Sequence, residues 1–306
     1  MRKKEEKKGN VILALLAVYV IWGSTYLAIR IALEGFPPFM MAGVRYLVSG
    51  TALFIFLRLR GARGPDRAEW LGASLIGGLL LLGGNGGVAF AEQWVASGLA
   101  ALMIATVPLW TVLFAGLWRR WPSRRESVGI CLGFAGLILL NFEGDFKAHP
   151  AGAVALIFAA ACWSFGSVWS RYLPLPAGIM ASAAEMVAGG ALLLITSLLT
   201  GEKIVALPSL RPLAALVYLM IFGSIVGFSA YTYLLGRVRP AVATSYAYVN
   251  PVVAVALGVV FAGERLTTVG IASMPIILLG VVLVIRGQKN SSEEGRKNGG
   301  RIRPVR

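Results

Sequence analysis

Residues 11–33 read VILALLAVYVIWGSTYLAIRIAL, and this stretch decides the fold class of the chain. It contains a single charged side chain, that of Arg30. A helix of this length, rising about 1.5 Å per residue, spans about 35 Å. Because the hydrocarbon core of a bilayer is about 30 Å thick, the run predicts a membrane-spanning helix.

Nine further apolar runs of similar length follow this one. The ten predicted spans lie near 11–33, 39–58, 69–91, 96–118, 126–142, 151–171, 177–199, 212–235, 241–262 and 267–286. The loops between them are short, so no room remains for a second, soluble domain. The sequence therefore predicts an all-α polytopic membrane protein with ten transmembrane helices.

The composition supports a membrane protein and excludes an ordinary soluble enzyme. Of the 306 residues, 57% are hydrophobic and 14% are charged, whereas a soluble domain carries about 25% charged residues. If the N-terminus is cytoplasmic, 23 of the 29 Lys and Arg residues fall in cytoplasmic tails and loops and four fall outside. This bias predicts that both termini are cytoplasmic. The net charge of +15 then indicates an attraction to anionic lipids and no nucleic-acid partner.

The second half of the sequence repeats features of the first at a spacing of about 141–143 residues. Trp22…Arg30 aligns with Trp163…Arg171, and Thr106-Val107-Pro108 aligns with Val249-Asn250-Pro251. Each half holds five predicted spans, an odd number, so the second half enters the membrane from the opposite face. The prediction is two inverted five-helix repeats, 11–142 and 151–286, between a basic cytoplasmic N-tail, 1–10, and a basic, disordered cytoplasmic C-tail, 287–306.

Several motifs resemble those of the EamA-type branch of the drug/metabolite transporter superfamily. They are Trp22-Gly23-Ser24-Thr25, Thr106-Val107-Pro108, Tyr248-Val249-Asn250-Pro251 and Gly263-Glu264-Arg265-Leu266-Thr267. The resemblance covers about residues 12–286. It implies a basket of ten helices around a central cavity, in a bacterial inner membrane, that exports amino acids, related metabolites or drugs. The first half departs from the pattern, because Arg119-Arg120-Trp121-Pro122 stands where the second half has its Gly-Glu-Arg-Leu ending.

Two prolines mark candidate breaks in the helices. Pro108 and Pro251 lie near the middle of the fourth and ninth spans, where proline removes one backbone hydrogen bond and frees the carbonyls of Ile104 and Ala247. Matching interruptions in two repeats are a sequence signature of a transport site. The alternative is a structural kink that neighbouring helices satisfy.

Aromatic side chains deep within the spans are candidate substrate contacts. Trp22 and Tyr26 share one face of the first span, Trp163 lies equally deep in the sixth, and Tyr231 belongs to a stripe along the eighth. Their depth argues against an interfacial aromatic belt. Plain helix packing remains the alternative.

Two amide side chains and one further tyrosine complete the neutral candidates. In the ninth span, Tyr248 and Asn250 lie on roughly opposite faces, and we favour Tyr248 for the cavity, with Asn250 either joining helices or contacting the ligand. Asn85 stands within the glycines of residues 83–87. That segment lacks the Lys-Ser/Thr ending of a phosphate loop, so it predicts close helix packing or a flexible gate.

Two charged residues lie deep in predicted spans, where an ionised side chain is costly. Arg45 is a candidate partner for a substrate carboxylate, and Glu185 is a candidate carrier of a coupling proton. The two occupy corresponding positions of the repeats. A paired or snorkelling charge that holds helices together is the alternative for both.

The sequence favours a secondary transporter that exports small metabolites by alternating access. The single His149 and the apolar settings of Cys131 and Cys162 indicate no metal, no cofactor and no catalytic residue, which disfavours a membrane-embedded enzyme. A nucleotide-sugar or phosphate-ester carrier is the runner-up, but it calls for several deep cations where Arg45 is the clear candidate. The oligomeric state stays open.

Overall fold

The structure is a computed structural model that describes residues 2–118, 121–140, 142, 149–235, 246–265 and 267–297, and these residues form helices and no strands. The first half contains α1 (Arg2–Ala32), α2 (Pro38–Leu59), α3 (Arg67–Gly77), η1 (Gly78–Gly86), α4 (Gly87–Ala91), α5 (Ser97–Ile104), α6 (Val107–Ala115), η2 (Gly116–Trp118) and α7 (Arg124–Leu140). The second half contains α9 (Pro150–Trp169), η3 (Ser170–Tyr172), α10 (Ile179–Leu199), α11 (Leu210–Tyr218), η4 (Leu219–Val226), α12 (Gly227–Leu235), α14 (Tyr246–Ala262) and α15 (Thr268–Lys297).

Seven helical segments within the described residues are long and apolar enough to cross a membrane. They are Gly9–Ala32, Pro38–Leu59, Arg67–Ala91, Ser97–Trp118, Pro150–Tyr172, Ile179–Leu199 and Leu210–Tyr231. Shorter helices occupy the places of the remaining predicted spans: α7 the fifth, Val249–Ala262 the ninth and Thr268–Val284 the tenth. The prediction of an all-helical, multi-pass membrane protein is confirmed.

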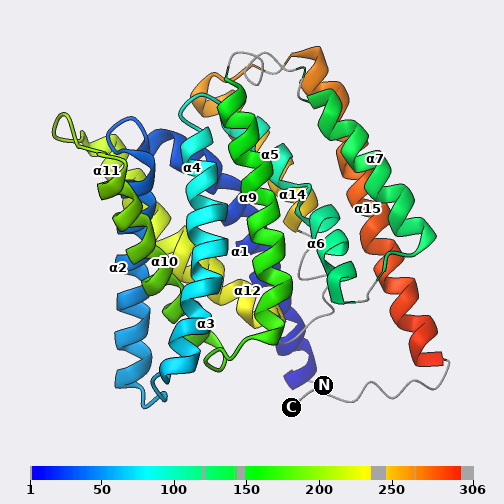
Figure 1. The fold of residues 1–306 in the computed structure, drawn as a ribbon, viewed down its shortest axis with the longest axis horizontal. Helices are drawn as coiled ribbons and strands as arrows, with labels where there is room; N and C mark the ends of the chain where they lie inside the picture. Colours follow the sequence, from blue (N-terminus) through cyan, green and yellow to red (C-terminus); the bar gives the residue numbers. More distant parts are fainter. Residues whose placement is uncertain are drawn as a thin grey trace.

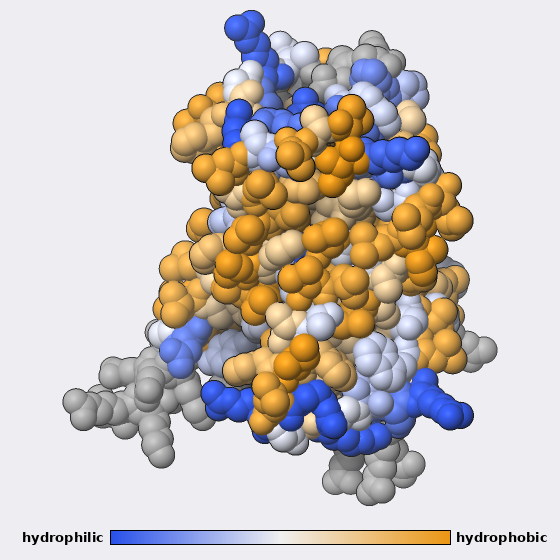
Figure 2. Space-filling view, turned by 90° about the vertical axis from the view of Figure 1, so that its left-hand side faces the viewer, coloured by the Kyte–Doolittle hydropathy of each residue, from blue (hydrophilic) through white to orange (hydrophobic). Residues whose placement is uncertain are grey.

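The surface has the pattern that a bilayer requires. Hydrophobic side chains cover the middle of the face drawn in Figure 2, and hydrophilic side chains gather at its two ends. Large apolar side chains such as Leu59, Val260 and Phe261 are more than half exposed. In a soluble protein such a surface would aggregate, whereas lipid tails cover it at no cost.

Counterpart helices of the two halves pack against each other in opposite directions. Along α2 and α10, Gly43 lies against Leu194, Leu47 against Gly190, and Gly50 against the backbone of Met186. The numbers rise along one helix and fall along the other, so the pair is antiparallel. Glycine in the contact lets the two backbones approach closely, which is the usual way for helices to associate in lipid.

The helices α7 and α15 form a second antiparallel pair at one edge of the bundle (Figure 1). Here Gly129 lies against Val284, and Gly133 and Gly280 touch each other. The fifth and tenth spans are counterparts in the sequence repeat, as the second and seventh are. Antiparallel packing of counterparts is what an inverted repeat requires.

Carboxylates tie the helix ends together on the side that the charge bias assigns to the outside. Glu202, after α10, accepts hydrogen bonds from the backbone N–H groups of Phe39 (3.1 Å) and Met40 (2.8 Å) at the start of α2. Glu264, after α14, accepts hydrogen bonds from the N–H groups of Ser97 (2.7 Å) and Gly98 (3.1 Å) at the start of α5. Each carboxylate satisfies donors that a helix N-terminus leaves free.

The two prolines behave differently. The fourth span is broken, because α5 ends at Ile104 and α6 begins at Val107, one residue before Pro108. The helix α14 instead continues through Pro251, contrary to the matching break that the sequence predicts. Neighbouring helices can satisfy a carbonyl that proline frees, so a membrane helix can tolerate the residue without breaking.

The two halves also share a less common feature, a stretch of π-helix. The segment η1 begins at Gly78 and η4 begins at Leu219, a separation equal to the 141-residue spacing of the sequence repeat. A π-helix is wider than an α-helix and is found mostly at functional sites. Both segments lie in the middle of their spans; η1 lines the cavity described below, and η4 bonds two side chains of its wall, Trp22 and Arg45.

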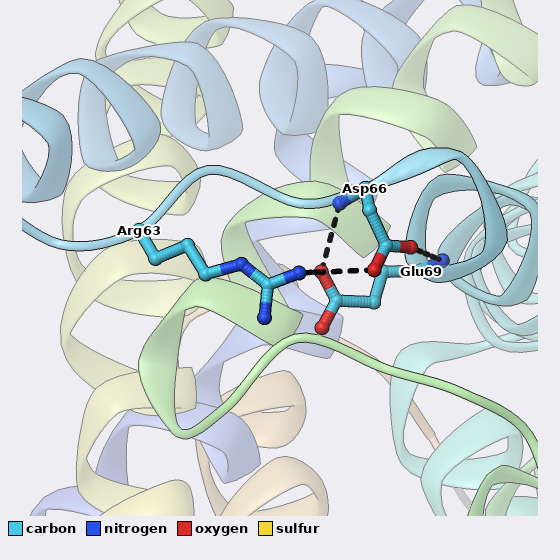
Figure 3. Close-up of polar contacts among 3 residues, drawn as sticks. All are labelled: Arg63, Asp66 and Glu69. Carbon is cyan, nitrogen blue, oxygen red and sulfur yellow. Dashed lines mark hydrogen bonds and ion pairs between the residues drawn. The ribbon is translucent and has the colours of Figure 1, made fainter.

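A capping box lies at the start of α3, at the end of the bundle that the charge bias assigns to the cytoplasm (Figure 3). The Asp66 carboxylate accepts a hydrogen bond from the Glu69 N–H (2.9 Å), the Glu69 carboxylate accepts one from the Asp66 N–H (2.8 Å), and Arg63 contacts Asp66 at 2.9 Å. The hydrogen bond from the Glu69 backbone lowers the pKa of Asp66. The stabilisation from this cap is therefore present at neutral pH and is lost as the pH falls through the lowered pKa.

The end of α15 differs from the predicted tail. The sequence places a disordered tail from residue 287 onward, but α15 continues through Lys297. Extending a helix that already exists requires no new nucleation, so polar residues are added to it at little cost. Both terminal helices, α1 and α15, have their chain ends at the same end of the bundle (Figure 1).

The contact between α2 and α10 provides a test of the packing. A Cβ at Gly190 would lie 2.5 Å from the backbone nitrogen of Leu47, whereas a Cβ at Gly116 would lie 3.5 Å from the Trp121 ring. We expect Gly190→Ala to destabilise the protein by about 1–3 kcal/mol, because the two backbones must move apart. Thermal unfolding in detergent measures this, with Gly116→Ala as the matched control. Equal melting temperatures of the two variants would contradict the close contact.

Candidate functional site

A cavity of about 80 Å³ lies inside the bundle between the two halves. Eleven of its 16 lining residues come from the first half and five from the second. The helices that contribute are α1, α2, η1, α4, α5 and α6 from the first half and α9, α12 and α14 from the second. Since both repeats build its walls, a movement of one half against the other would change its shape.

The structure brings six of the predicted site residues to this cavity. They are Trp22, Tyr26, Arg45, Asn85, Trp163 and Asn250. Whether they bind a substrate stays a prediction.

Five further predicted residues do not line the cavity or cannot be placed there. Tyr231 packs behind the wall, 5.1 Å from Trp22 between ring centroids. The prolines 108 and 251 are buried next to Val107 and Asn250, which do line the cavity. Glu185 is half-buried and absent from the cavity wall. The side chain of Tyr248 lies outside the described residues.

Trp22 is the centre of an aromatic cluster that joins the two halves. Its ring lies 5.0 Å from Tyr246, 5.1 Å from Tyr231, 5.5 Å from Phe228 and 6.5 Å from Trp163, measured between centroids. Most of these pairs are edge-to-face, the arrangement that ring quadrupoles favour. Four of the five rings line the cavity, so its wall is a rigid aromatic surface.

The π-helical segments supply carbonyl oxygens that side chains of the site use. The indole N–H of Trp22 donates to the carbonyl of Gly223 (3.2 Å), and the Asn85 amide donates to the carbonyl of Leu80 (3.3 Å). Gly223 lies in η4 and Leu80 in η1. These bonds hold one side chain from α1 and one from η1 in fixed positions at the cavity.

Arg45 is the most unusual group in the cavity wall. Its side chain is 3% exposed, its Nε donates to the Ser224 hydroxyl (2.9 Å), and its guanidinium lies 4.6 Å from the centroid of the Tyr46 ring. Among the described residues no carboxylate lies within ion-pair distance of it. A buried cation without an anion is costly, so Arg45 stays a candidate functional residue.

Two neutral polar atoms of residues in the cavity wall are without partners in the described part of the chain. The Tyr46 hydroxyl and the Asn250 Oδ1 are buried and have no hydrogen bond within the described residues, and both side chains line the cavity. Buried polar groups are nearly always hydrogen-bonded, so each unpartnered one requires an explanation. A ligand or water in the cavity would satisfy both.

Sequence reasoning missed Tyr46 in the cavity wall and did not find the inward face of α14. Tyr46 was not predicted, although its position directly after an intramembrane charge was a usable signal. Tyr246 lines the cavity together with Asn250, so this face of α14 points inward. Helical periodicity had separated this face from that of Tyr248, and the sequence-based prediction favoured Tyr248, whose side chain lies outside the described residues.

Comparison with known proteins matches the chain to a protein family. The model of the EamA-like transporter family matches residues 9–142 and 150–286, which are the two halves. The chain is 50% identical to the "Uncharacterized inner membrane transporter YedA" of Escherichia coli K12, over 90% of both chains. It is 24% identical to the "Uncharacterized transporter YvbV" of Bacillus subtilis 168 (92% and 93% covered) and 26% identical to "Protein PecM" of Dickeya dadantii 3937 (86% and 88% covered).

A solved structure described as "Crystal structure of protein" has the same fold. It aligns with a TM-score of 0.64 at 21% identity and covers 90% of this chain and 96% of its own. At this level of identity, the similarity concerns the fold alone.

Substitutions of Trp22 test its central place in the site. We expect Trp22→Ala to destabilise the protein by about 3–5 kcal/mol, because it removes the ring on which both halves pack. Trp22→Phe keeps a ring but leaves the Gly223 carbonyl without its donor, and we expect a loss of about 1–3 kcal/mol. Unfolding in detergent provides the measurement.

Trp121, which is 79% exposed, is the matched control for that experiment. Its replacement by Ala should change stability by no more than about 0.5 kcal/mol. If Trp22→Ala proved no more destabilising than Trp121→Ala, the aromatic cluster would not hold the halves together.

Proposed function

The chain belongs to the EamA-like transporter family, and we propose that it is a secondary transporter that exports small metabolites, amino acids or related compounds, by alternating access. The membrane is the inner membrane, as the name of the E. coli relative says of that protein. Both termini face the cytoplasm, as the distribution of Lys and Arg predicts.

The observation that carries the choice of substrate is Arg45. A guanidinium recognises a carboxylate through two parallel hydrogen bonds, and Arg45 uses its Nε on Ser224 while its Nη groups have no carboxylate partner in the described residues. Ser224 and the Tyr46 ring hold the group in place before a ligand arrives. A substrate carboxylate would neutralise the buried charge.

The rest of the wall suits the other groups of an amino acid. The Trp22 ring offers a face to an ammonium group, and the Asn250 Oδ1 offers an unused acceptor. The volume of about 80 Å³ lies below the roughly 300–1,000 Å³ of sites for drug-sized ligands. In this conformation the cavity therefore favours small solutes over larger drugs.

Two features of the fold support alternating access. Counterpart helices pack antiparallel in the pairs α2–α10 and α7–α15, and the π-helical segments η1 and η4 occupy equivalent positions beside the cavity. Inverted repeats around a site near the midplane can exchange conformations, which opens the site to one face and then to the other.

The phosphate-ester or nucleotide-sugar carrier remains the second candidate, and the cavity disfavours it. Arg45 is the one Lys or Arg among the residues that line the cavity in the described part of the chain. A phosphate group carries up to two charges and is normally bound by several cations. A membrane-embedded enzyme is less supported still, because the names of the relatives indicate transport.

Transport by purified protein in proteoliposomes tests the role of Arg45. The solutes are a panel of labelled amino acids and, for each, the amine that lacks the carboxylate. We expect the wild type to prefer the amino acid over the amine. In Arg45→Ala this preference should fall by about 10- to 100-fold, which corresponds to the free energy of one charge-assisted hydrogen bond. Arg45→Lys should recover part of it, because it restores the charge without the planar fork.

Arg211 provides the control, since it is an exposed arginine that pairs with Glu34 at 3.5 Å. Arg211→Ala should transport like the wild type. Absence of saturable flux for every solute, with correctly inserted protein, would contradict the exporter function. Equal transport of amine and amino acid by the wild type would contradict the carboxylate site alone.

The position of Glu185 leads to a separate prediction about the coupling of transport to protons. Because Glu185 lies outside the cavity wall, we expect Glu185→Gln to transport at the wild-type rate and with the wild-type response to a pH gradient. Flux is compared with and without an imposed gradient in both proteins. A selective loss of the gradient response in Glu185→Gln would restore this residue as the proton carrier.

A further inference from the structure

Glu92 is a buried carboxyl group with no partner. It directly follows α4, and the third span ends at the preceding residue, Ala91. Its side chain is 0% exposed, and neither carboxyl oxygen has a hydrogen bond within the described residues. An ionised carboxylate in such a place would be very unfavourable, so this conformation favours the protonated form.

Four charged or titratable groups surround Glu92. Arg30 of α1 donates a hydrogen bond to the backbone carbonyl of Glu92, but the carboxyl group of Glu92 accepts none. Arg45 of α2 attracts the carboxylate, Glu264 beyond α14 repels it, and Tyr26 of α1 lies within electrostatic reach. Burial first, and Glu264 second, raise the pKa of Glu92 well above its usual value in spite of the two arginines.

The surroundings of Glu92 form a closed end of the bundle. Ser97 at the start of α5 is 0% exposed, and Gly98 lies directly against Val255 of α14. The Glu264 carboxylate joins α5 to the end of α14 at the same place. This is the end that the charge bias assigns to the outside, so in this conformation α5 and the end of α14 are packed together on that side near Glu92.

Release of a substrate to the outside requires this end to open. Opening would bring water to Glu92, and a hydrated glutamate side chain, with a pKa of about 4.3, is ionised at neutral pH. The closed conformation therefore binds a proton at Glu92 more tightly than the open one. By linkage, a proton bound there favours closure to the same extent.

We propose that Glu92 is the binding site for a proton from the outer side, and that its occupation is required for the outer end of the bundle to close. The inference rests on the proposed transport cycle, in which the emptied carrier must close outside before it reopens inside. Protons at the outer face then accelerate the return step. Val88, one helical turn before Glu92, lines the cavity, so the proton site borders the substrate site.

Access to Ser97 reports opening of this end without any transported substrate. Ser97→Cys is placed in a background in which Cys131 and Cys162 are serine, and the protein in right-side-out vesicles is treated with a membrane-impermeant maleimide. Gln93→Cys, an exposed position nearby, corrects for the pH dependence of the thiol reaction itself. The quantity measured is the ratio of the two labelling rates between about pH 6 and about pH 9.

We expect this ratio to rise by about tenfold with pH in the protein that retains Glu92. Glu92→Gln carries a permanently neutral amide of the same shape, so its ratio should stay low at every pH. Glu34→Gln, which neutralises an exposed carboxylate, should behave like the parent protein. Glu92→Asp should retain the rise with a shifted midpoint, and it provides the test if Glu92→Gln fails to fold.

Two results would overturn the proposal: a ratio independent of pH in the parent protein, or an unchanged pH dependence in Glu92→Gln. Because labelling needs no solute, its outcome is separate from the flux measurements. Labelling that depends on pH, without any solute flux, would contradict the exporter function but not the proton site. Saturable flux with pH-independent access would contradict the proton site alone.

Discussion

The absence of water inside a bilayer is the constraint on which this structure depends. Every polar group within the bundle has to find its partner in the protein or in a ligand. Most do: Trp22 bonds the Gly223 carbonyl, and the carboxylates of Glu202 and Glu264 satisfy the helix starts of α2 and α5. The exceptions therefore carry meaning. Arg45 has no anion, and Glu92 has no hydrogen bond at its carboxyl group, in the part of the chain that the structure describes.

Both exceptions belong to the first half, and Arg45 lies within electrostatic reach of Glu92. Antiparallel contacts between counterpart helices, made close by glycines such as Gly50 and Gly190, hold one half against the other. The π-helical segments occupy equivalent positions in the two halves, where η1 lines the cavity and η4 bonds Trp22 and Arg45 in its wall. Arg45 lines this cavity, and Glu92 lies one helical turn beyond Val88 in its wall. The proposed substrate and proton sites therefore border each other, the arrangement that coupling through a single conformational change requires.

Prediction from sequence succeeded where one residue, or one periodic pattern, carried the signal. Trp22, Trp163 and Arg45 stood out because aromatic and charged side chains are unusual deep in a span, and all three line the cavity. Glu185 stood out for the same reason, but it does not line the cavity. Depth in the membrane is a property of the chain, whereas direction around the bundle depends on which helices become neighbours. No pattern within a single span reports that choice.

The sequence by itself determined the helical class, the span positions, the repeat and the family. The reason is that the length and spacing of apolar runs are local properties, and the thickness of the bilayer sets the length that a spanning helix needs. The tertiary structure alone decided that Tyr46 and Tyr246 line the cavity and that Glu92 is buried. It also decided that the helix is interrupted before Pro108 but continues through Pro251. Each of these depends on contacts between segments tens to hundreds of residues apart. Only packing between helices determines whether a buried polar group meets a partner, a ligand or nothing.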